Sequence, residues 1–333
     1  MPDSKIGIVG ASGLVGRTLL AVIAEHRFPF SELRLFASDQ SEGNQLQFGN
    51  HKYALRRLEH NCFEGLDFVF FVSTNQVSLD WAPDAVKSGA LVIDNSKAYR
   101  MDPEVPLIVP EINGNQLFRN RGIIANPNCS TVQTVMALYP LEKEFGLQRV
   151  VVSTYQSVSG SGKLALEQLK SERAGVKEVH PKVYPHPIFN NCLPHIGTFL
   201  ENGYTDEEMK MVHESRKILN LPELRITATT VRVPVEYSHS ISVNVELKKD
   251  FTLETVRNLY TKMPGVILRD EPQKNIYPLA REVSGQDAVF VGRIRRDFSI
   301  PNGLNLWVVA DNLRKGAASN ALQIAEYWLQ SRH

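Results

Sequence analysis

Cys129 stands where a short apolar segment gives way to a helical pattern. Residues 123–125 are apolar, and from Thr131 onward the apolar residues recur at helical spacing until Pro140, which is expected to kink or end the helix. Free N–H groups and the dipole at a helix N-terminus stabilise a thiolate and lower the pKa of the thiol. The same groups stabilise the oxyanion formed when sulfur attacks a carbonyl. Cys129 is therefore a candidate nucleophile, and the alternative is a small buried side chain.

A catalytic thiol usually works with a nearby histidine. His239 opens a segment whose odd positions from 241 to 247 are apolar, and this alternation predicts a half-buried, antiparallel strand. An imidazole held there by packing is a candidate partner for Cys129, and the alternative is a purely structural histidine. Cys62 and Cys192 lack such a context and are expected to be structural. No metal site is expected, because three further histidines show no ligand spacing with the cysteines: His180, His186 and His195.

Two arginines are candidates for binding anionic groups. Arg232 lies inside an otherwise apolar strand, where a guanidinium must be paired or must face a cleft. Arg100 follows the strand expected at residues 91–93, and ligands gather at the carboxyl ends of parallel strands. The alternative for Arg100 is a solvated charge on a loop.

A helix is predicted to begin after Thr205, because Thr205 and Glu208 have the spacing of a capping box. Glu207 and Lys210 stand three residues apart and are therefore neighbours on one face of this helix. From the pattern alone, this face is interpreted as a solvated ladder of ion pairs that continues to Glu214.

A glycine-rich turn joins the first expected strand to the first expected helix. Gly10, Gly13 and Gly16 have the spacing G-x-x-G-x-x-G, which allows a tight turn and lets backbone N–H groups approach a pyrophosphate. The alternative is a plain turn that needs glycine only for its backbone angles. After the second strand, Ser38 and Ser41 suit the 2′-phosphate of NADP whereas Asp39 does not, so these residues alone leave the choice of cofactor open.

The elements that must position these residues fall into two different halves. The first half alternates strands with helices and predicts a parallel sheet with right-handed crossovers. The second half predicts an α+β domain with a large mixed sheet, and residues 175–193 are interpreted as a long surface or interface loop. The strands expected are residues 5–9, 33–36, 68–72, 91–93, 150–155, 225–235, 241–247, 289–293 and 304–310, and the principal helices are 14–25, 81–87, 253–262 and 315–330.

Composition indicates an ordinary globular protein of about two domains. The chain has 333 residues, 43% hydrophobic and 22% charged, and domains of about 150 residues are typical. A net charge of +1 gives no reason to expect nucleic acid or an anionic membrane as a partner. No apolar stretch is long enough to span a bilayer, and no signal-peptide pattern precedes the first strand. With three cysteines, too few for a disulfide framework, a cytoplasmic location is expected.

Together these features resemble the aspartate-semialdehyde dehydrogenase family over essentially the whole chain. The family reduces L-aspartyl 4-phosphate to L-aspartate 4-semialdehyde with NADPH and releases phosphate. This reaction feeds the synthesis of diaminopimelate, lysine, threonine and methionine. The motifs that carry the resemblance are residues 10–16, 93–101, 127–131, 155–162, 207–211, 232–239 and 310–317.

The resemblance implies a role for each candidate in catalysis and substrate binding. Cys129 is the acyl-enzyme nucleophile, His239 is the general acid–base and Gln156 orients the covalent intermediate. Arg232 binds the substrate carboxylate through two parallel hydrogen bonds, a geometry suited to a guanidinium. Glu207 meets the substrate amino group. The phosphate is held by Arg100, Asn128 and Lys210.

The resemblance also implies NADP as the cofactor. Family members commonly carry Arg where this chain has Gln40, so a relaxed preference that admits NAD stays open. Three groups of residues are expected at the cofactor. Gly10, Ser12, Gly13, Leu14, Val15 and Gly16 lie against its phosphates, Ser38 and Ser41 near the adenosine ribose, and Ser159, Gly160 and Asn312 near the nicotinamide.

The fold implied is α/β, with a Rossmann-like NADP-binding domain at residues 1–130, completed by a C-terminal helix at 314–333. Residues 131–313 form an α+β catalytic and dimerisation domain, which implies a homodimer or a dimer of dimers whose partners are a small-molecule substrate and phosphate. One alternative is another acyl-phosphate reductase such as N-acetyl-glutamyl-phosphate reductase, whose acylated amine would not need Glu207. A non-catalytic paralogue is the other.

Overall fold

The computed structural model describes residues 4–38, 41–176 and 180–331, which divide into two compact units. Unit 1 comprises residues 1–128 and 317–333, and unit 2 comprises residues 129–316. The C-terminal helix α9 (Ser319–Gln330) therefore belongs to the same unit as the glycine turn. No helix among the described residues is long and apolar enough to cross a membrane.

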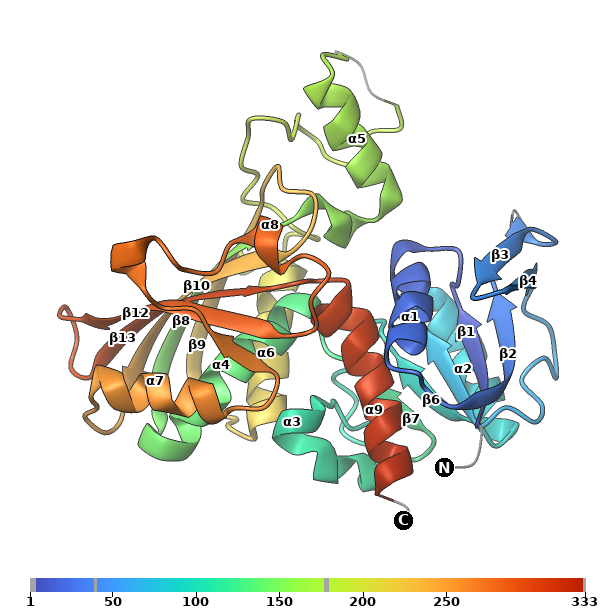
Figure 1. The fold of residues 1–333 in the computed structure, drawn as a ribbon, viewed down its shortest axis with the longest axis horizontal. Helices are drawn as coiled ribbons and strands as arrows, with labels where there is room; N and C mark the ends of the chain where they lie inside the picture. The colour runs from blue at the N-terminus through green and yellow to red at the C-terminus, as the bar shows by residue number, and fades with distance from the viewer. Residues whose placement is uncertain (1–3, 39–40, 177–179, 332–333) are drawn as a thin grey trace. The chain divides into compact units, whose positions relative to one another are not determined.

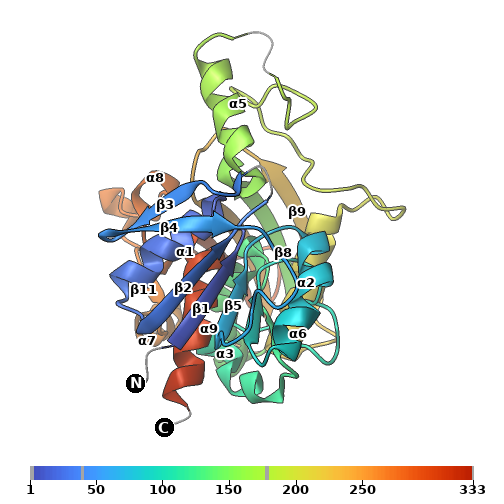
Figure 2. The same ribbon diagram turned by 90° about the vertical axis from the view of Figure 1, so that its right-hand side faces the viewer.

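Unit 1 is built on a seven-stranded sheet in the order β3-β4-β2-β1-β5-β6-β7 (Figures 1 and 2). All pairs in it are parallel except β3 with β4. Every strand predicted in the first half is present, and the parallel crossovers are confirmed. The strands are β1 (Ser4–Val9), β2 (Phe30–Phe36), β3 (Gln45–Phe48), β4 (His51–Arg56), β5 (Phe68–Phe71), β6 (Leu91–Asp94) and β7 (Ile123–Ala125).

Helices cover both faces of this sheet, so that its central strands are buried. On one face, Ile6 and Ile8 of β1 pack in a core with α1 (Leu14–Glu25) and α9. On the other, Val9 packs with Ala82 and Ala85 of α2 (Asn75–Lys87). The remaining helical segments of unit 1 are α3 (Pro110–Asn113) and η2 (Gly114–Arg119).

Two local features of unit 1 differ from the prediction. Helix α2 begins at Asn75 and not at residue 81, because Thr74 caps it by accepting a hydrogen bond from the N–H of Val77. The antiparallel pair β3–β4 was not predicted. Only Leu46 is buried in β3, so the strand shows almost no alternation of buried and exposed residues. The spacing of apolar residues therefore gives little indication of a strand in such an edge element.

Unit 2 contains a six-stranded mixed sheet in the order β11-β12-β13-β10-β8-β9. The predicted strand at His239 is antiparallel to both neighbours, as expected, whereas β8 and β9 run parallel. The strands are β8 (Leu147–Gln156), β9 (Arg225–Arg232), β10 (His239–Leu247), β11 (Val266–Leu268), β12 (Val289–Asp297) and β13 (Gly303–Ala310).

Helices α4 (Cys129–Phe145), α6 (Asp206–Leu219) and α7 (Leu253–Lys262) pack on one face of this sheet (Figure 1). Helix α4 starts at Cys129, two residues earlier than expected. It continues past Pro140, so of the two expected effects of this proline, a kink or an end of the helix, the end does not occur. The other segments of unit 2 are η3 (Val158–Ser161), α5 (Lys163–Arg173), η4 (Pro272–Lys274), α8 (Ala280–Val283) and the π-helical η5 (Arg314–Ala318), whose last two residues belong to unit 1.

The helix-covered face of the sheet changes from apolar to polar toward the ends of β8 and β9. Along β8 the buried residues run Val150, Val152, Thr154 and Gln156, and along β9 the buried row ends in Arg232. The two strands are parallel, so both polar ends lie at the same edge of the sheet. Polar side chains buried at one edge need partners or a ligand there.

Candidate active site

The sulfur of Cys129 faces the imidazole of His239 inside unit 2. Cys129 is the first residue of α4 and His239 the first residue of β10, and Sγ lies 3.3 Å from Nε2. The cysteine is half-buried and the histidine is fully buried. A thiol in contact with an imidazole at a helix N-terminus is the arrangement that activates a cysteine nucleophile.

The ring of His239 is held from its far side by Ser157. The backbone N–H of Ser157 donates to Nδ1 at 3.0 Å, and its hydroxyl lies 3.1 Å from the same atom. Burial, together with the positive charge of Arg232, holds the pKa of His239 well below its usual range. The imidazole is therefore neutral near pH 7.

Arg232 and Gln156 end two neighbouring parallel strands and are paired in register. Arg232 is 4% exposed, and its Nη1 donates to the carbonyl of Ser157 at 2.6 Å. No carboxylate among the described residues forms an ion pair with Arg232, and its Nε has no hydrogen-bond partner among them. A buried guanidinium in this state is suited to bind an anion, and a carboxylate fits its planar fork.

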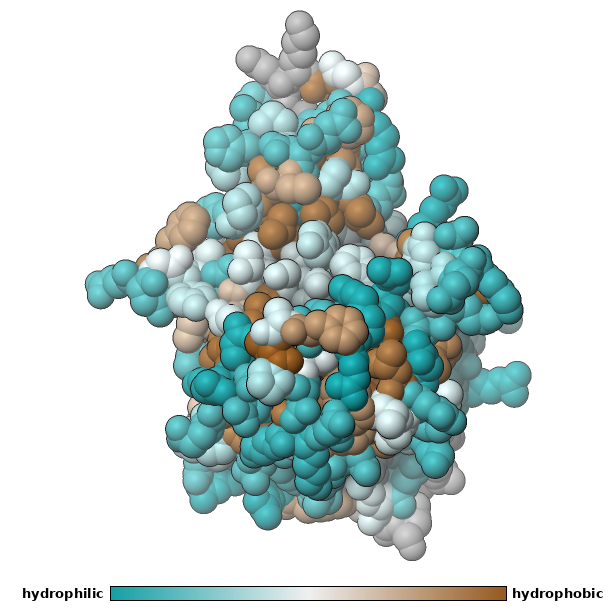
Figure 3. Space-filling view, turned by 90° about the vertical axis from the view of Figure 1, so that its left-hand side faces the viewer, coloured by the Kyte–Doolittle hydropathy of each residue, from teal (hydrophilic) through white to brown (hydrophobic). Residues whose placement is uncertain are grey.

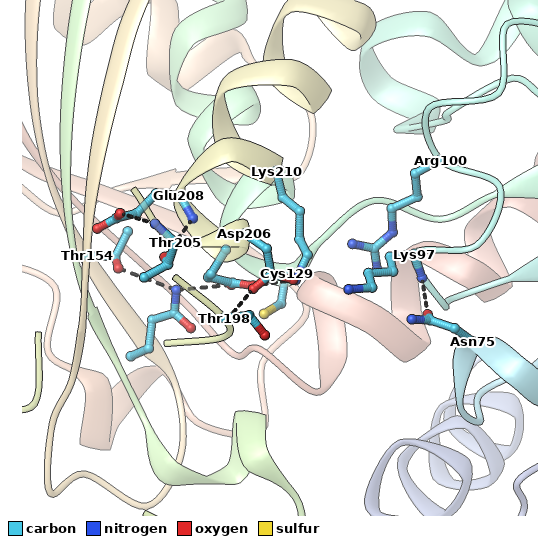
Figure 4. Close-up of polar contacts among 12 residues, drawn as sticks. Asn75, Lys97, Arg100, Cys129, Thr154, Thr198, Thr205, Asp206, Glu208 and Lys210 are labelled. Atoms are coloured by element: carbon cyan, nitrogen blue, oxygen red, sulfur yellow. Dashed lines mark hydrogen bonds and ion pairs between the residues drawn. The ribbon is translucent and has the colours of Figure 1, made fainter. Parts of the chain in front are cut away.

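Helix α6 presents a cluster of charged side chains next to Gln156. The Nε2 of Gln156 donates to Glu207 at 3.3 Å, and Nζ of Lys210 lies 3.1 Å from Glu207. Nζ of Lys210 also lies 3.2 Å from Asp206, and both residues are labelled in Figure 4. Burial alone would lower the pKa of Lys210, but Glu207 and Asp206 outweigh this effect and raise it. Lys210 therefore keeps its charge and can serve an anionic group.

The solvated ladder interpreted for α6 is wrong, because the helix turns Glu207 and Glu214 inward, where they are 6% and 1% exposed. The capping box, in contrast, is confirmed: Thr205 accepts from the N–H of Glu208, and Glu208 accepts from the N–H of Thr205. Glu208 also accepts from the N–H of Thr230 at 2.9 Å. This second bond fastens the first turn of α6 to β9 and so fixes Glu207 relative to the sheet.

Segment η5 approaches Cys129 so closely that only glycine fits at position 316. A Cβ added at Gly316 would lie 2.7 Å from the Cβ of Cys129, which is closer than real side chains come. The glycine lets the π-helical turn pack directly against the nucleophile. Irregular helical turns of this kind are frequent at functional sites.

Arg100 is buried in unit 1, so the solvated-loop alternative does not hold. It is 8% exposed, its Nε donates to the carbonyl of Asn126 at 3.0 Å, and its Nη2 donates to the carbonyl of Asn95 at 2.7 Å. Asn320 of α9 binds the side chain of Asn126 at 2.7 Å and thereby fixes the segment that holds the arginine. Nearby in unit 1, Lys97 donates its N–H to Asn75 (Figure 4), and Asn128 is 8% exposed.

The glycine turn of unit 1 is shaped as a nucleotide-binding turn. A Cβ at Gly10, where φ is +91°, would lie 2.6 Å from the carbonyl oxygen of Val72, and a Cβ at Gly16 would lie 2.4 Å from that of Gly10. Gly13 caps α1, whose first turn carries no acidic residue that would oppose an anion. Ser12, Leu14 and Val15 complete this turn and are half-buried.

A cavity of about 400 Å³ adjoins the turn and is of a size that suits the adenosine part of a dinucleotide. It is polar beside Ser38 and apolar beside Leu58 and Trp81, as a ribose and an adenine ring require. The N–H of Ser41 donates to the carbonyl of Ser38, so both predicted hydroxyl residues belong to one turn. Gln40, on which the NADP preference turns, lies outside the described residues. The cavity is lined by Val9, Gly10, Ala37, Ser38, Leu58, Ser73, Val77 and Trp81.

Three residues expected at the nicotinamide lie in unit 2 near His239. A Cβ at Gly160 would be 3.4 Å from Nε2 of His239 and 3.0 Å from Nη1 of Arg232. The hydroxyl of Ser159 lies 3.1 Å from Oδ1 of Asn312. Ser157 was not identified as a site residue, although it stands directly after Gln156 in a quoted motif. Its role depends on a strand pairing that no local pattern contains.

Within residues 4–38, 41–176 and 180–331, no group of three His, Cys, Asp or Glu side chains is placed to hold a metal ion.

A glycine turn on a parallel sheet and a Cys–His pair at the edge of a mixed sheet define an oxidoreductase of the semialdehyde dehydrogenase class. Residues 5–119 match the model for "Semialdehyde dehydrogenase, NAD binding domain", and residues 138–315 match "Semialdehyde dehydrogenase, dimerisation domain". The chain belongs to the aspartate-semialdehyde dehydrogenase family.

Individual relatives match over nearly their whole length. The chain is 49% identical to the aspartate-semialdehyde dehydrogenase of Aquifex aeolicus over 97% of both chains, and 44% identical to that of Bacillus subtilis over 96% of both. Among solved structures, aspartate semialdehyde dehydrogenase II of Vibrio cholerae in complex with ASA superposes with a TM-score of 0.95 at 41% identity and covers 99% of each chain. The recognition of the family and of its α/β fold from the sequence is thus confirmed.

Proposed function

We propose that this protein catalyses the NADPH-dependent reduction of L-aspartyl 4-phosphate to L-aspartate 4-semialdehyde and phosphate. The observation that carries the proposal is the contact between Cys129 Sγ and His239 Nε2 beside the buried Arg232, which pairs with no carboxylate of the described residues. A thiol nucleophile explains a covalent acyl intermediate, and the guanidinium explains an acidic substrate. The full-length similarity to aspartate-semialdehyde dehydrogenases supports the same reaction.

Each side chain has a proposed role that its surroundings support. Arg232 binds the substrate carboxylate, and Glu207, with its buried carboxylate beside Gln156, meets the free amino group. This recognition of a free amine favours an aspartyl substrate over an N-acetylated one. Lys210 of unit 2 binds the phosphate. In unit 1, Arg100 and Asn128 bind it as well.

The reaction proceeds through a thioester on Cys129. The thiolate attacks the acyl carbonyl, the C–O bond to phosphate breaks, and phosphate leaves with the electron pair. Gln156 orients the acyl group, and the N–H at Nε2 of His239 hydrogen-bonds the sulfur and, after hydride transfer, the oxyanion. NADPH, when bound, would supply the hydride that reduces the thioester carbon. The resulting oxyanion collapses, the C–S bond breaks, and the aldehyde leaves as the thiolate returns.

The two units divide this work between them. Unit 1 binds NADP through the glycine turn from Gly10 to Gly16 and through the hydroxyls of Ser38 and Ser41, which suit a 2′-phosphate. Unit 2 carries the catalytic residues, and its Ser159, Gly160 and Asn312 lie on the nicotinamide side. Unit 2 also forms the interface of a homodimer.

The open face of the unit 2 sheet supports dimerisation. On it Tyr155 and Trp307 pack in a tilted pair with ring centroids 5.6 Å apart, and Tyr155 remains 39% exposed. Apolar side chains also gather in patches on one face of the molecule (Figure 3). Exposed aromatic side chains on a sheet face are typical of protein interfaces.

A paired assay tests the function. Purified protein is given L-aspartate 4-semialdehyde or N-acetyl-L-glutamate 5-semialdehyde, each with phosphate and either NADP or NAD. We expect phosphate-dependent formation of NADPH with the aspartate compound alone, and slower turnover with NAD. Preference for the N-acetylated compound would show that Glu207 does not select a free amine. Cofactor binding without turnover of either compound would identify a non-catalytic paralogue.

A further inference from the structure

The imidazole of His239 is part of a buried chain of hydrogen bonds that the reaction itself does not explain. From the ring, the chain runs to the hydroxyl of Ser157, which lies 3.0 Å from Oδ1 of Asn312. The same Oδ1 accepts from the backbone N–H of Ser238 at 3.0 Å. All four residues are at most 3% exposed, so no bulk water substitutes for these bonds.

The direction of the first bond is fixed by its donor. A backbone N–H can only donate, and that of Ser157 points at Nδ1 from 3.0 Å. Nδ1 must therefore present its lone pair, and a neutral ring then carries its hydrogen on Nε2. Nε2 is the atom that faces the sulfur of Cys129 at 3.3 Å.

The orientation of Asn312 is fixed in the same way. Its amide can be turned to present oxygen or nitrogen, but the N–H of Ser238 requires the oxygen. Ser238 has a φ of +69°, an unusual value for a residue with a side chain, and it directly precedes His239. Asn312 thus holds both the strained turn before the histidine and the hydroxyl behind it.

We propose that Ser157 and Asn312 are positioning residues that hold His239 as the neutral tautomer with its proton on Nε2: the backbone N–H of Ser157 donates to Nδ1, and Asn312 anchors Ser157 by accepting the hydrogen of its hydroxyl. In this form the ring donates a hydrogen bond to the Cys129 thiolate without becoming an imidazolium. The same N–H is then placed for the oxyanion formed from the thioester. This inference rests on the proposed function for its catalytic meaning, but the tautomer is a property of the resting protein.

The charges around the ring agree with a neutral imidazole. Arg232, from β9, opposes a second positive charge, and the thiol of Cys129 comes from the first turn of α4. Segment η3 contributes the uncharged Ser159, and the chain just after β13 contributes the uncharged Asn312. The acidic and basic groups of α6, Glu207 and Lys210, bind Gln156 and each other.

The direct test is NMR spectroscopy of the wild-type protein labelled with ¹⁵N-histidine. The His239 signals are assigned by their loss in His239→Gln, and the spectra are taken without substrate at neutral pH. We expect Nε2 to carry the proton and Nδ1 to be unprotonated. A protonated Nδ1 would overturn the proposal. Because the experiment needs no turnover, it remains decisive even where the proposed function fails.

A second test follows the reactivity of Cys129 in variants. Alkylation by iodoacetamide is measured against pH at the peptide that carries Cys129, since Cys62 and Cys192 also react. Ser157→Ala should slow alkylation at pH 7 by about five- to tenfold, the worth of one buried hydrogen bond. Ser157→Thr, which keeps the hydroxyl, should restore it. Ser215→Ala is the matched control, because this buried hydroxyl has no hydrogen-bond partner among the described residues.

A double-mutant cycle separates this role of Asn312 from a cofactor contact. If Ser157 and Asn312 act through one chain of hydrogen bonds, Cys129 in the double variant Ser157→Ala/Asn312→Ala should be alkylated no more slowly than in the slower of the two single variants. The role given to Asn312 would be overturned if the two substitutions slowed alkylation independently, so that their fold-effects multiplied, and if only Asn312→Ala raised the Kd for NADP. An unchanged pH profile of alkylation in Ser157→Ala would overturn that of Ser157.

Discussion

The Nε2 atom of His239 lies 3.3 Å from the Sγ atom of Cys129, although 110 positions separate the two residues. One begins a helix and the other begins a strand, so neither depends on a flexible loop. Strand pairing fixes the histidine further, since it lies opposite Ala310 of β13, while the next residue lies opposite Tyr155 of β8. The pair is therefore preorganised by the sheet, as catalysis by a thiol and an imidazole requires.

Arg232→Lys should weaken substrate binding more than it disturbs the fold. An ammonium cannot make the two parallel hydrogen bonds of a guanidinium, and we expect kcat/KM for aspartate semialdehyde to fall about ten- to a hundredfold. Steady-state kinetics measure the effect. Arg225→Lys, at the exposed start of the same strand, is the matched control and should behave as wild type. Equal kcat/KM for Arg232→Lys and wild type would remove Arg232 from the site.

Two helix caps separate stability from substrate binding. Thr205 caps α6, which carries Glu207 and Lys210, whereas Thr252 caps α7, which carries no site residue. Each change to alanine should lower the free energy of unfolding by about 0.5–2 kcal/mol. Urea unfolding measures this cost, and kinetics should show a raised KM for aspartate semialdehyde in Thr205→Ala alone. A similar KM in both variants would mean that the first turn of α6 does not position the substrate groups.

Stability should depend on pH through His239. In the folded protein burial and Arg232 lower its pKa well below 6.5, so below about pH 6.5 the unfolded chain binds a proton that the folded chain does not. The free energy of unfolding is therefore lost as the pH falls, by at most about 1.4 kcal/mol per pH unit from this group. Between pH 7.5 and 5.5, the free energy of unfolding of His239→Gln should fall by about 1 kcal/mol less than that of the wild type. Equal losses in urea unfolding at the two pH values would contradict a buried neutral ring.

Gly316→Ala should displace the nucleophile. The added methyl group would meet the Cβ of Cys129 at 2.7 Å, and misplacing a reacting atom by even a fraction of this distance is costly. We expect kcat to fall about ten- to a hundredfold. Gly303→Ala is the control, because its Cβ would be equally crowded, 2.5 Å from the carbonyl oxygen of Asp297, at the far end of β13. Normal kcat in Gly316→Ala would show that η5 yields without moving the sulfur.

Local chemistry in the sequence was enough to single out several candidate site residues. Cys129 was a candidate because it stands at a helix start, Arg232 because it is a charge in an apolar strand, and the turn at Gly10 because of its spacing and position. Each signal lies within a few residues of the side chain concerned. The capping box at Thr205 was found in the same way and is confirmed.

Long-range relationships could not be predicted from these patterns. Glu207 has the spacing of a surface residue, and only the packing of α6 on β9 shows that it is buried. Ser157 acquires its role because β8 ends beside the start of β10. The orientation of Asn312 depends on the backbone of Ser238, 74 residues away. In each case the decisive contact is set by strand register, which local periodicity does not encode.

The most direct test of the account is whether an acyl group forms on Cys129. Enzyme at high concentration is mixed with aspartate semialdehyde and NADP in the absence of phosphate, so that the acyl-enzyme is formed without its usual acceptor. We predict a rapid burst of about one NADPH per chain and, by mass spectrometry, an aspartyl group on the peptide containing Cys129. No burst, or an acyl group carried on another residue, would contradict the thioester mechanism.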